Sequence, residues 1–279
     1  MTGASSGLGA GFARRLAREG YDLILVARDE GRLQAFADEL ARDCPLTAIE
    51  AVSADLATPE GRRAVVGLMA SAPVDLLVNN AGMGYATPAT SNTIDQELRL
   101  VQVNAVATLE LTLAALHAMR RRGRGSIINV ASVAAVGPSW LDSTYGASKA
   151  CVLRFSEDLG YSERVRAAGV RVMALLPGNI RTEFHERAGI PERSLPMWRY
   201  LTVDKVVDAC LRDLAKGKAI STPSARYKVL KALLHHLPRR VSASFAWDCG
   251  VRESVPVRQR RHPCRASRRA NTPWSLDPR

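Results

Sequence analysis

Hydrophobic and polar positions follow two regular patterns from Thr2 to about Ile220. Short apolar, β-branched runs predict buried strands, and longer stretches with apolar residues at helical spacing predict amphipathic helices. The predicted strands are Tyr21–Ala27, Leu46–Val52, Val74–Val78, Ser126–Val130 and Val170–Leu176. The predicted helices are Leu8–Glu19, Asp29–Leu40, Pro59–Ala70, Thr93–Arg122 and Asp142–Ala168. Strands that alternate with helices indicate crossover units, so we expect a doubly wound α/β fold with one parallel sheet.

The two ends of the chain depart from this pattern. Met1 is followed at once by a Gly/Ser-rich loop, and such a loop normally follows a strand. Tyr227–Leu237 has the pattern of a basic amphipathic helix, for which packing on the domain is favoured over peripheral contact with an anionic membrane. We predict a single dinucleotide-binding domain over residues 1–240 and a basic, disordered tail over residues 241–279.

Composition narrows the class of protein. The 279 residues are 47% hydrophobic with a mean hydropathy of −0.08, as in soluble globular proteins. No apolar run reaches the ~18 residues of a membrane-spanning helix. The five cysteines are scattered, which fits reduced thiols in a cytoplasmic protein. Because no close cluster of His, Cys and Asp supplies a ligand set, we expect no bound metal.

The net charge of +12 is unevenly distributed. Residues 239–279 hold ten arginines and three acidic residues, and therefore carry +7 of that charge. A basic patch for nucleic acid must lie on a structured face. We therefore expect no nucleic-acid partner, and a disordered arm that binds nucleic acid remains the minority alternative.

The loop Thr2–Gly9 (TGASSGLG) opens the first predicted helix. Its glycines permit a tight turn and let the backbone approach a pyrophosphate, whose charge then lies at the helix N-terminus. The spacing is G-x-x-x-G-x-G rather than the G-x-G-x-x-G fingerprint, and a flexible leader explains the loop equally well when it is taken alone. The residues expected to bind a cofactor here are Gly3, Ser5, Ser6, Gly7, Leu8 and Gly9.

Further polar groups follow the predicted strands, where ligands bind in such sheets. Arg28 follows the first strand, and a guanidinium at this point favours the 2′-phosphate of NADP over the free hydroxyl of NAD; the alternative is a solvated surface arginine. Asp55 follows the next strand and either accepts from the adenine amino group or caps a loop. The third predicted strand is followed by Asn79, Ala81 and Gly82, which either bind the cofactor or form a turn.

A serine, a tyrosine and a lysine predict the reacting end of the site. Ser132 follows a strand, and Tyr145 and Lys149 lie four residues apart on one face of a predicted helix. The Lys149 ammonium, helped by an oxidised nicotinamide, would lower the pKa of Tyr145 so that it can donate a proton to a ketone. Ser132 could hydrogen-bond to the developing alkoxide. Asn104, polar in an apolar helix, could hold a water that links Lys149 to solvent.

Six motifs in matching order and spacing resemble those of the classical short-chain dehydrogenase/reductase family over residues 2–220. They are TGASSGLG, NNAG, Asn104, Ser132, YGASK at 145–149 and PGNIRT at 177–182. The resemblance implies a Rossmann-like domain, usually with seven strands, and the catalytic residues Asn104, Ser132, Tyr145 and Lys149. It implies a homo-oligomer and an NADP(H) cofactor preferred over NAD(H), with Tyr145 and Lys149 among its contacts. It also implies four residues beside the nicotinamide: Pro177, Gly178, Ile180 and Thr182.

One departure from the family concerns the sheet. Family members carry an apolar strand before the glycine loop, in the middle of the sheet, between the strands that precede Arg28 and Asn79. Its loss would leave unpaired backbone groups and a void. We therefore predict that Met1 is an internal start and that the first strand is missing. The alternative to an enzyme is an N-terminally truncated, inactive or non-catalytic NADP-binding relative.

The function expected from these residues is hydride transfer between NADP(H) and a carbonyl or secondary alcohol. A pure cofactor binder gains nothing from Ser132, Tyr145 and Lys149 together. The segment between Thr182 and Thr202 is expected to cover the substrate. Its apolar side chains predict a hydrophobic small molecule: Phe184, Ile190, Leu195, Met197 and Trp198.

Overall fold

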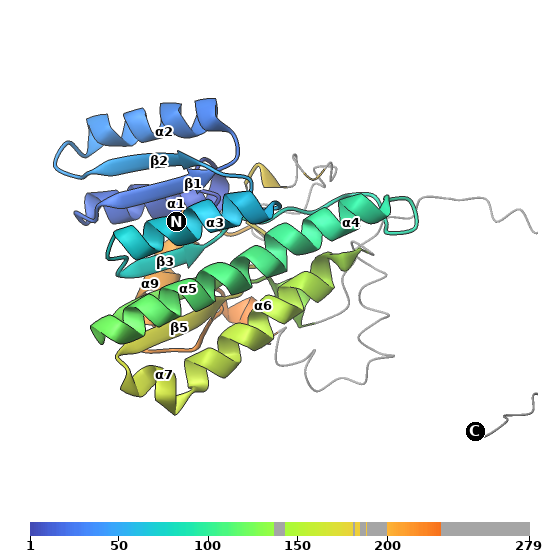
Figure 1. Cartoon of the computed structure of the whole chain (residues 1–279). Helices are drawn as coiled ribbons and strands as arrows, with labels where there is room; N and C mark the ends of the chain where they lie inside the picture. Colours follow the sequence, from blue (N-terminus) through green and yellow to red (C-terminus); the bar gives the residue numbers. More distant parts are fainter. Residues whose placement is uncertain (137–142, 181, 185–187, 189–199, 230–279) are drawn as a thin grey trace, which may run out of the picture. The chain divides into compact units, whose positions relative to one another are not determined.

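The computed structural model describes residues 1–136, 143–180, 182–184, 188 and 200–229. Within this part of the chain, parallel strands alternate with helices (Figure 1). The strands are β1 Leu23–Ala27, β2 Ile49–Ser53, β3 Leu76–Asn79, β4 Gly125–Val130, β5 Val170–Leu175 and β6 Ile220–Ser221. The helices are α1 Gly7–Arg18, α2 Glu30–Asp43, α3 Pro59–Ser71, α4 Ile94–Val101, α5 Ala107–Arg122, α6 Thr144–Tyr161, α7 Glu163–Ala167 and α9 Val203–Ala215. The predicted α/β fold is confirmed.

Local sequence explains where several helices begin and end. Asp29 caps α2 because its carboxylate accepts the Arg32 N–H at 3.0 Å. Thr58 caps α3 in the same way, and its hydroxyl accepts the Gly61 N–H at 3.1 Å. At the other end of α5, Gly123 has a φ of 71°, a left-handed conformation that ends the helix.

The predicted helix over 93–122 is one continuous helix with a change of pitch inside it. A π-helical turn, Gln102–Val106, joins α4 to α5 and carries the fully buried Asn104. By length and composition alone, Ile94–Arg122 could cross a membrane, but half of its apolar window is buried inside the protein. Since α5 packs on β3, β4 and α3, we interpret this helix as a core helix.

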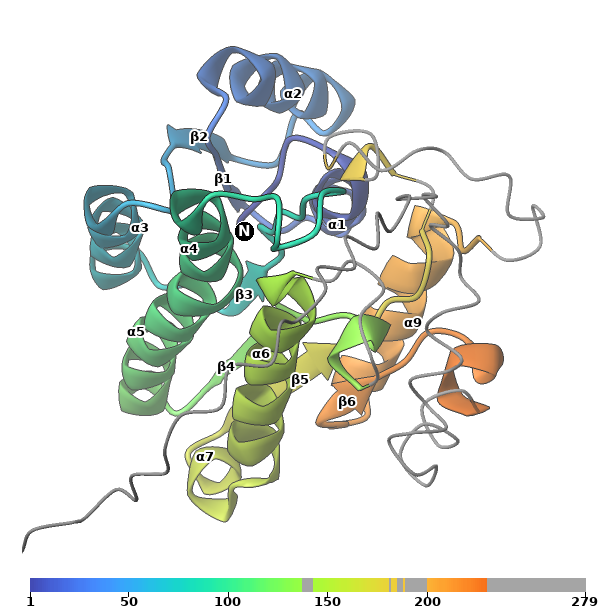
Figure 2. The same ribbon diagram turned by 90° about the vertical axis from the view of Figure 1, so that its right-hand side faces the viewer.

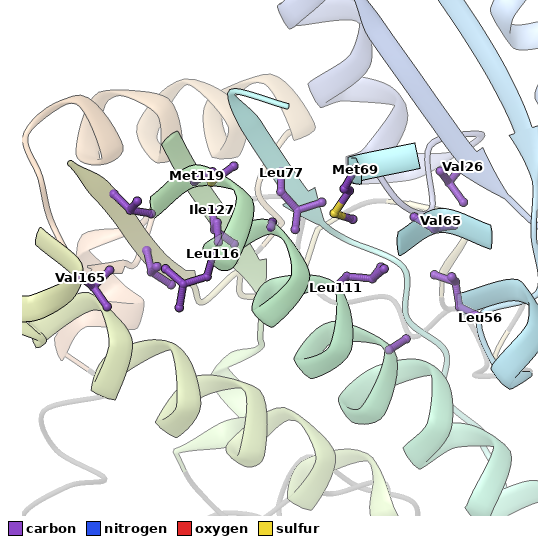
Figure 3. Close-up of a cluster of buried hydrophobic side chains, with 14 of the residues drawn as sticks. Val26, Leu56, Val65, Met69, Leu77, Leu111, Leu116, Met119, Ile127 and Val165 are labelled. Atoms are coloured by element: carbon purple, nitrogen blue, oxygen red, sulfur yellow. The ribbon is translucent and has the colours of Figure 1, made fainter. Parts of the chain in front are cut away.

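Helices cover both faces of the sheet (Figure 2). Successive residues of β3 point to opposite faces, as strand geometry requires. Leu77 packs in a cluster with side chains of α3 and α5 (Figure 3), whereas Val78 packs with α1 and α9 on the other face. A third cluster joins α1, β1 and α2. Within the described residues, the helices therefore leave the ends of the strands and the loops that follow them accessible to ligands.

The sheet consists of two hydrogen-bonded groups of strands, β1-β2 and β3-β4-β5-β6. Residues 1–4 run between them, in the place where the sequence predicts the missing strand. The Val26 N–H donates to the Met1 carbonyl at 2.8 Å, and the Thr2 N–H donates to the Val78 carbonyl at 3.0 Å. Thr2 and Val26 form an isolated parallel bridge, so this segment connects β1 to β3 through a few backbone hydrogen bonds rather than as a full strand.

A second cavity lies toward the opposite ends of the strands, with a volume of about 830 Å³. Leu76 and Ser126 line it from the starts of β3 and β4, together with the last turns of α1 and α9. Exposed side chains such as Tyr21, Arg124 and Arg212 also line it, so this cavity is a cleft open to solvent. At the junction itself the Met1 amino group is buried, donates to the Ile24 carbonyl at 2.5 Å, and has its pKa lowered by burial from 8.0 to about 5.

Several predicted features lie outside the described residues. The helix expected over Tyr227–Leu237 is described only to Val229, and residues 225–229 are helical. The basic tail expected over 241–279 is not among the described residues. Four side chains expected to contact substrate also lie outside them: Ile190, Leu195, Met197 and Trp198.

Candidate active site

The loops after the carboxyl ends of the strands surround a cavity of about 640 Å³, a size typical of small-molecule and cofactor sites. Its wall contains most of the predicted cofactor residues: Gly3, Ser5, Ser6, Gly7, Leu8, Arg28, Asp55, Ala81, Gly82, Tyr145, Lys149, Pro177, Gly178, Ile180 and Thr182. Ser132 also lines it. Three predicted residues do not line this wall: Gly9, Asn79 and Asn104.

The glycine loop has the tight backbone that the sequence predicts. Gly3 and Gly7 have φ values of 62° and 52°, which favour glycine. A side chain at Gly9 would clash with the carbonyl of Gly3, so Gly9 lets the loop close rather than lining the cavity. The Asn80 Nδ2 donates to the carbonyls of Thr2 and Gly3 at 3.2 and 3.0 Å. The loop is thus held to the end of β3, a contact that the motif alone does not reveal.

The start of α1 fits the phosphates of a dinucleotide. Its first turn bears no acidic residue, and the side chain of Ser6, at the N-cap, makes no capping hydrogen bond. The first N–H groups of a helix have no partner within the helix, and the helix dipole favours an anion beside them. Because Ser5, Ser6 and Gly7 all line the cavity, the backbone N–H groups at this helix start can hold a pyrophosphate.

Asp55 reaches the cavity wall as a carboxylate held by two donors. Its Oδ2 pairs with Arg99 at 2.7 Å, and its Oδ1 accepts the Ala57 N–H at 3.0 Å. Burial raises the pKa of Asp55, but the hydrogen bonds from Arg99 and Ala57 outweigh it and hold the pKa below its ordinary value. An ionised oxygen here can accept from an adenine amino group. Sequence reasoning missed Arg99, which comes from α4 and has no motif around it.

Tyr145 and Ser132 meet at the reacting end of the cavity. Tyr145 is 9% exposed and shares a hydrogen bond with Ser132. Burial raises the pKa of the Tyr145 hydroxyl, and the hydrogen bond with Ser132 offsets this only in part. The protonated hydroxyl is therefore the stable form, which suits a proton donor. The lowering of the Tyr145 pKa that is expected from Lys149 together with a bound oxidised nicotinamide stays a prediction.

Lys149 lies beneath Tyr145 on α6 and is 4% exposed. Its Nζ donates to the Val130 carbonyl at 2.8 Å, and burial lowers its pKa from 10.5 to about 8. A side chain at Gly82 would place its Cβ 3.2 Å from this Nζ and 3.3 Å from Asn104 Oδ1. Lys149 and Asn104 therefore converge on Gly82, where a larger residue would require either side chain to shift by a few tenths of an ångström.

Asn104 holds the loop after β3. Its Oδ1 accepts the Met83 N–H at 2.8 Å, and its Nδ2 donates to the Met83 carbonyl at 2.9 Å and to Ser148 Oγ at 3.2 Å. The π-helical turn brings this amide to the site, and π-turns often occur at functional positions. The predicted water beside Asn104 stays a prediction.

Asn79 lies elsewhere than the sequence predicts. It is 3% exposed, and its Nδ2 donates to Thr112 Oγ1 at 3.1 Å and to Asn129 Oδ1 at 2.9 Å, inside the core. The next residue, Asn80, lines the cavity instead. The correction follows from strand geometry, because neighbouring residues at a strand end point to opposite sides.

Apolar side chains surround Tyr145 on its open side. The rings of Tyr145 and Phe184 lie 5.9 Å apart, centre to centre, and are tilted by 48°. Leu100 and Ala188 are buried in the same cluster, and Met83 packs against it. Phe184 thus occupies the position expected of a substrate-contacting residue.

The fold and the site define a class: enzymes that bind a nicotinamide dinucleotide at the carboxyl edge of a parallel sheet and use a tyrosine as the proton donor. A family model described as short chain dehydrogenase matches residues 1–192. The chain belongs to the short-chain dehydrogenase/reductase family, whose members are oxidoreductases that bind a nicotinamide cofactor.

Three similar proteins illustrate the match. An uncharacterized oxidoreductase of Staphylococcus epidermidis is 30% identical over 225 residues, which cover 79% of this chain and 92% of the relative. A short-chain dehydrogenase from Sphingobium yanoikuyae in complex with NADPH is 36% identical, with a TM-score of 0.76 over 86% of this chain and 95% of that one. A bulky-bulky ketone specific alcohol dehydrogenase from Comamonas testosteroni is 31% identical, with a TM-score of 0.72 over 86% and 94% of the two chains.

Proposed function

We propose that the protein is an NADP(H)-dependent oxidoreductase that transfers a hydride between the nicotinamide and the carbonyl or secondary-alcohol carbon of a hydrophobic small molecule. The observation that carries this proposal is the meeting of Ser132, Tyr145 and Lys149 in the cavity that Arg28 also lines. The cytoplasmic location and the homo-oligomeric state expected from the sequence stay predictions.

The bound cofactor supplies or accepts the hydride. In the direction of reduction, the Tyr145 hydroxyl gives its proton to the carbonyl oxygen, which the Ser132 hydroxyl holds by a hydrogen bond. Lys149, with a pKa of about 8, exchanges protons near neutral pH, and its charged form favours the tyrosinate that remains after the transfer. Asn104 keeps the Met83 loop in place behind this group.

Arg28 supports NADP(H) over NAD(H). It is exposed, lines the cavity directly after β1, and makes no ion pair with the other described residues. A guanidinium in this position offers charge-assisted hydrogen bonds to a 2′-phosphate. The similar Sphingobium yanoikuyae enzyme is described in complex with NADPH, which agrees with this proposal.

A hydrophobic ketone or alcohol is the substrate class that the wall around Tyr145 favours. Phe184, Leu100 and Ala188 form an apolar cluster with the Tyr145 ring, so a polar substrate would lose hydration there without new hydrogen bonds. The similar Comamonas testosteroni enzyme is named for bulky ketones, which supports the same class here.

An exchange of charge at Arg28 tests the cofactor proposal. Dissociation constants for NADPH and NADH are measured for the unmodified protein, for Arg28→Asp and for Arg42→Asp. Arg42 is exposed in α2 and does not line the cavity, so its variant controls for net charge. We expect Arg28→Asp to weaken NADPH binding about 100-fold, since it removes a charge-assisted contact and adds a like charge. An equal loss in both variants, or an unmodified protein that prefers NADH, would overturn the preference for NADP(H).

A further inference from the structure

A second arginine lies on the wall that Arg28 lines. Arg32 is in the first turn of α2, and its Nε donates to the Ser5 carbonyl of the glycine loop at 3.1 Å. Its Nη2 donates to both carboxylate oxygens of Glu183 at 2.6 Å. Arg32 is therefore anchored at the cofactor cavity and neutralised there by a carboxylate.

The Arg32–Glu183 pair joins two parts of the site that are 151 residues apart in the chain. Arg32 belongs to the adenosine side, four residues after Arg28. Glu183 follows Thr182, and both of its neighbours, Thr182 and Phe184, line the cavity. The pair thus places a carboxylate 2.6 Å from Arg32, on the wall of the cavity that Arg28 also lines.

We propose that Glu183 and the 2′-phosphate of NADP(H) compete for Arg32. In this proposal, which rests on the proposed function, Arg32 is a second phosphate-binding residue and Glu183 limits the preference for NADP(H) over NAD(H). The guanidinium suits both partners, because carboxylates and phosphates accept the same paired N–H donors. A cofactor without the 2′-phosphate leaves the ion pair intact, whereas NADP(H) must displace Glu183 to reach all the donors of Arg32.

The expected effects are moderate because the pair is partly solvated. The side chains of Arg32 and Glu183 are 40% and 43% exposed, and exposed ion pairs shift equilibria by only about two- to five-fold. The chain offers a matched control in Arg14–Glu39, a pair at 2.7 Å with 39% and 43% exposure whose residues do not line the cavity.

The test measures dissociation constants for NADPH and NADH with the unmodified protein, Glu183→Gln, Arg32→Gln, the double variant and Glu39→Gln. We expect Glu183→Gln to raise the preference for NADPH about three-fold and Arg32→Gln to lower it about five-fold. Glu183→Gln should have no further effect when Arg32 is absent, because the two changes act through one interaction. Glu39→Gln should leave the preference unchanged, and 1 M salt should reduce the effect of Glu183→Gln.

Two outcomes overturn the competition and leave the proposed function standing. In the first, Glu183→Gln changes the affinities for NADPH and NADH equally. In the second, its effect on the preference persists in the Arg32→Gln background. An unmodified protein that binds neither cofactor would instead overturn the proposed function, and this inference with it.

Discussion

The two ends of the sheet differ in how completely they are built. At the carboxyl ends, hydrogen bonds from several elements hold the glycine loop, Asp55 and Asn104 in place. Toward the amino ends lies a solvent-open cleft of about 830 Å³, and within the described part of the chain residues 1–4 alone are hydrogen-bonded to both β1 and β3. The site depends on hydrogen bonds between segments distant in sequence, whereas the junction of β1 and β3 depends on one short segment at the start of the chain. Variants at the two ends should therefore affect turnover and stability separately.

The largest expected effect is at Tyr145. Tyr145→Phe removes the proton donor, and we expect turnover to fall by about 10²- to 10⁴-fold. The affinity for NADPH and the melting temperature should change little, because the ring and its packing remain. Steady-state kinetics and thermal unfolding check both statements. Tyr161→Phe is the control, since Tyr161 ends the same helix but is 58% exposed. Substantial turnover in Tyr145→Phe would contradict the mechanism.

Replacing Lys149 should lower activity and raise stability. Its pKa falls from 10.5 in a solvated lysine to about 8 in the folded protein, so between these values the unfolded state binds more protons. Stability from this group therefore rises with pH between 8 and 10.5, and the full cost of burying the charge is present below pH 8. Lys149→Met should lower turnover by about 100-fold.

Lys149→Met should raise the free energy of unfolding at pH 7 by roughly 1–3 kcal/mol. This is less than the free energy that corresponds to the whole shift in the Lys149 pKa, because the Val130 carbonyl loses its donor. Urea unfolding at pH 7 and near pH 10.5 measures this. The gain should shrink at the higher pH. Lys216→Met, at an exposed position, should change stability little at either pH. A difference between Lys149→Met and the unmodified protein that does not vary with pH would contradict the assignment.

Filling the gap between β1 and β3 should change stability alone. We expect five apolar, β-branched residues added before Met1 to raise the free energy of unfolding by about 3 kcal/mol, through apolar burial and removal of the buried amino group. Five Gly and Ser residues form the control. Urea unfolding compares the two, and turnover per folded molecule should be equal. Equal stability of the two extended proteins would show that the gap does not accept a strand.

The smallest expected effect concerns Tyr227, which packs on Gly178. Its hydroxyl accepts the Asn179 N–H at 3.0 Å, and so holds the loop on the nicotinamide side. Tyr227→Phe should raise the KM for NADPH about two- to five-fold, because a single neutral hydrogen bond is lost. Tyr21→Phe, at a 47% exposed position outside the active-site cavity, should have no effect on this KM. An unchanged KM in Tyr227→Phe would limit this contact to packing.

The sequence predicts the site better than it predicts the contacts that support it. Motif spacing places Ser132, Tyr145 and Lys149 together because Ser132 follows β4 and the other two lie four residues apart on one face of α6, the next helix. It assigns Asn79 instead of Asn80 to the wall, since a shift of one residue at a strand end reverses the direction of a side chain.

Contacts between distant segments leave no signature in the sequence. Arg99 reaches Asp55 from a helix 44 residues later, and Arg32 reaches Glu183 over 151 residues. Periodicity identifies the helices that carry these arginines but not the partners they meet in three dimensions. The cleft at the amino ends of the strands likewise depends on packing, since its walls come from the starts of β3 and β4 and from the last turns of α1 and α9.

Thermal unfolding of the unmodified chain tests the central claim most directly. That claim is a formed NADP(H) site on an incompletely filled sheet. The melting temperature is measured without cofactor, with NADPH and with NADH. A ligand that binds only the native state raises the melting temperature, by an amount that grows with the logarithm of its concentration divided by its dissociation constant. The account predicts one cooperative transition, whose melting temperature is raised more by NADPH than by NADH. The absence of a cooperative transition, or a melting temperature that NADH raises more than NADPH does, would contradict it.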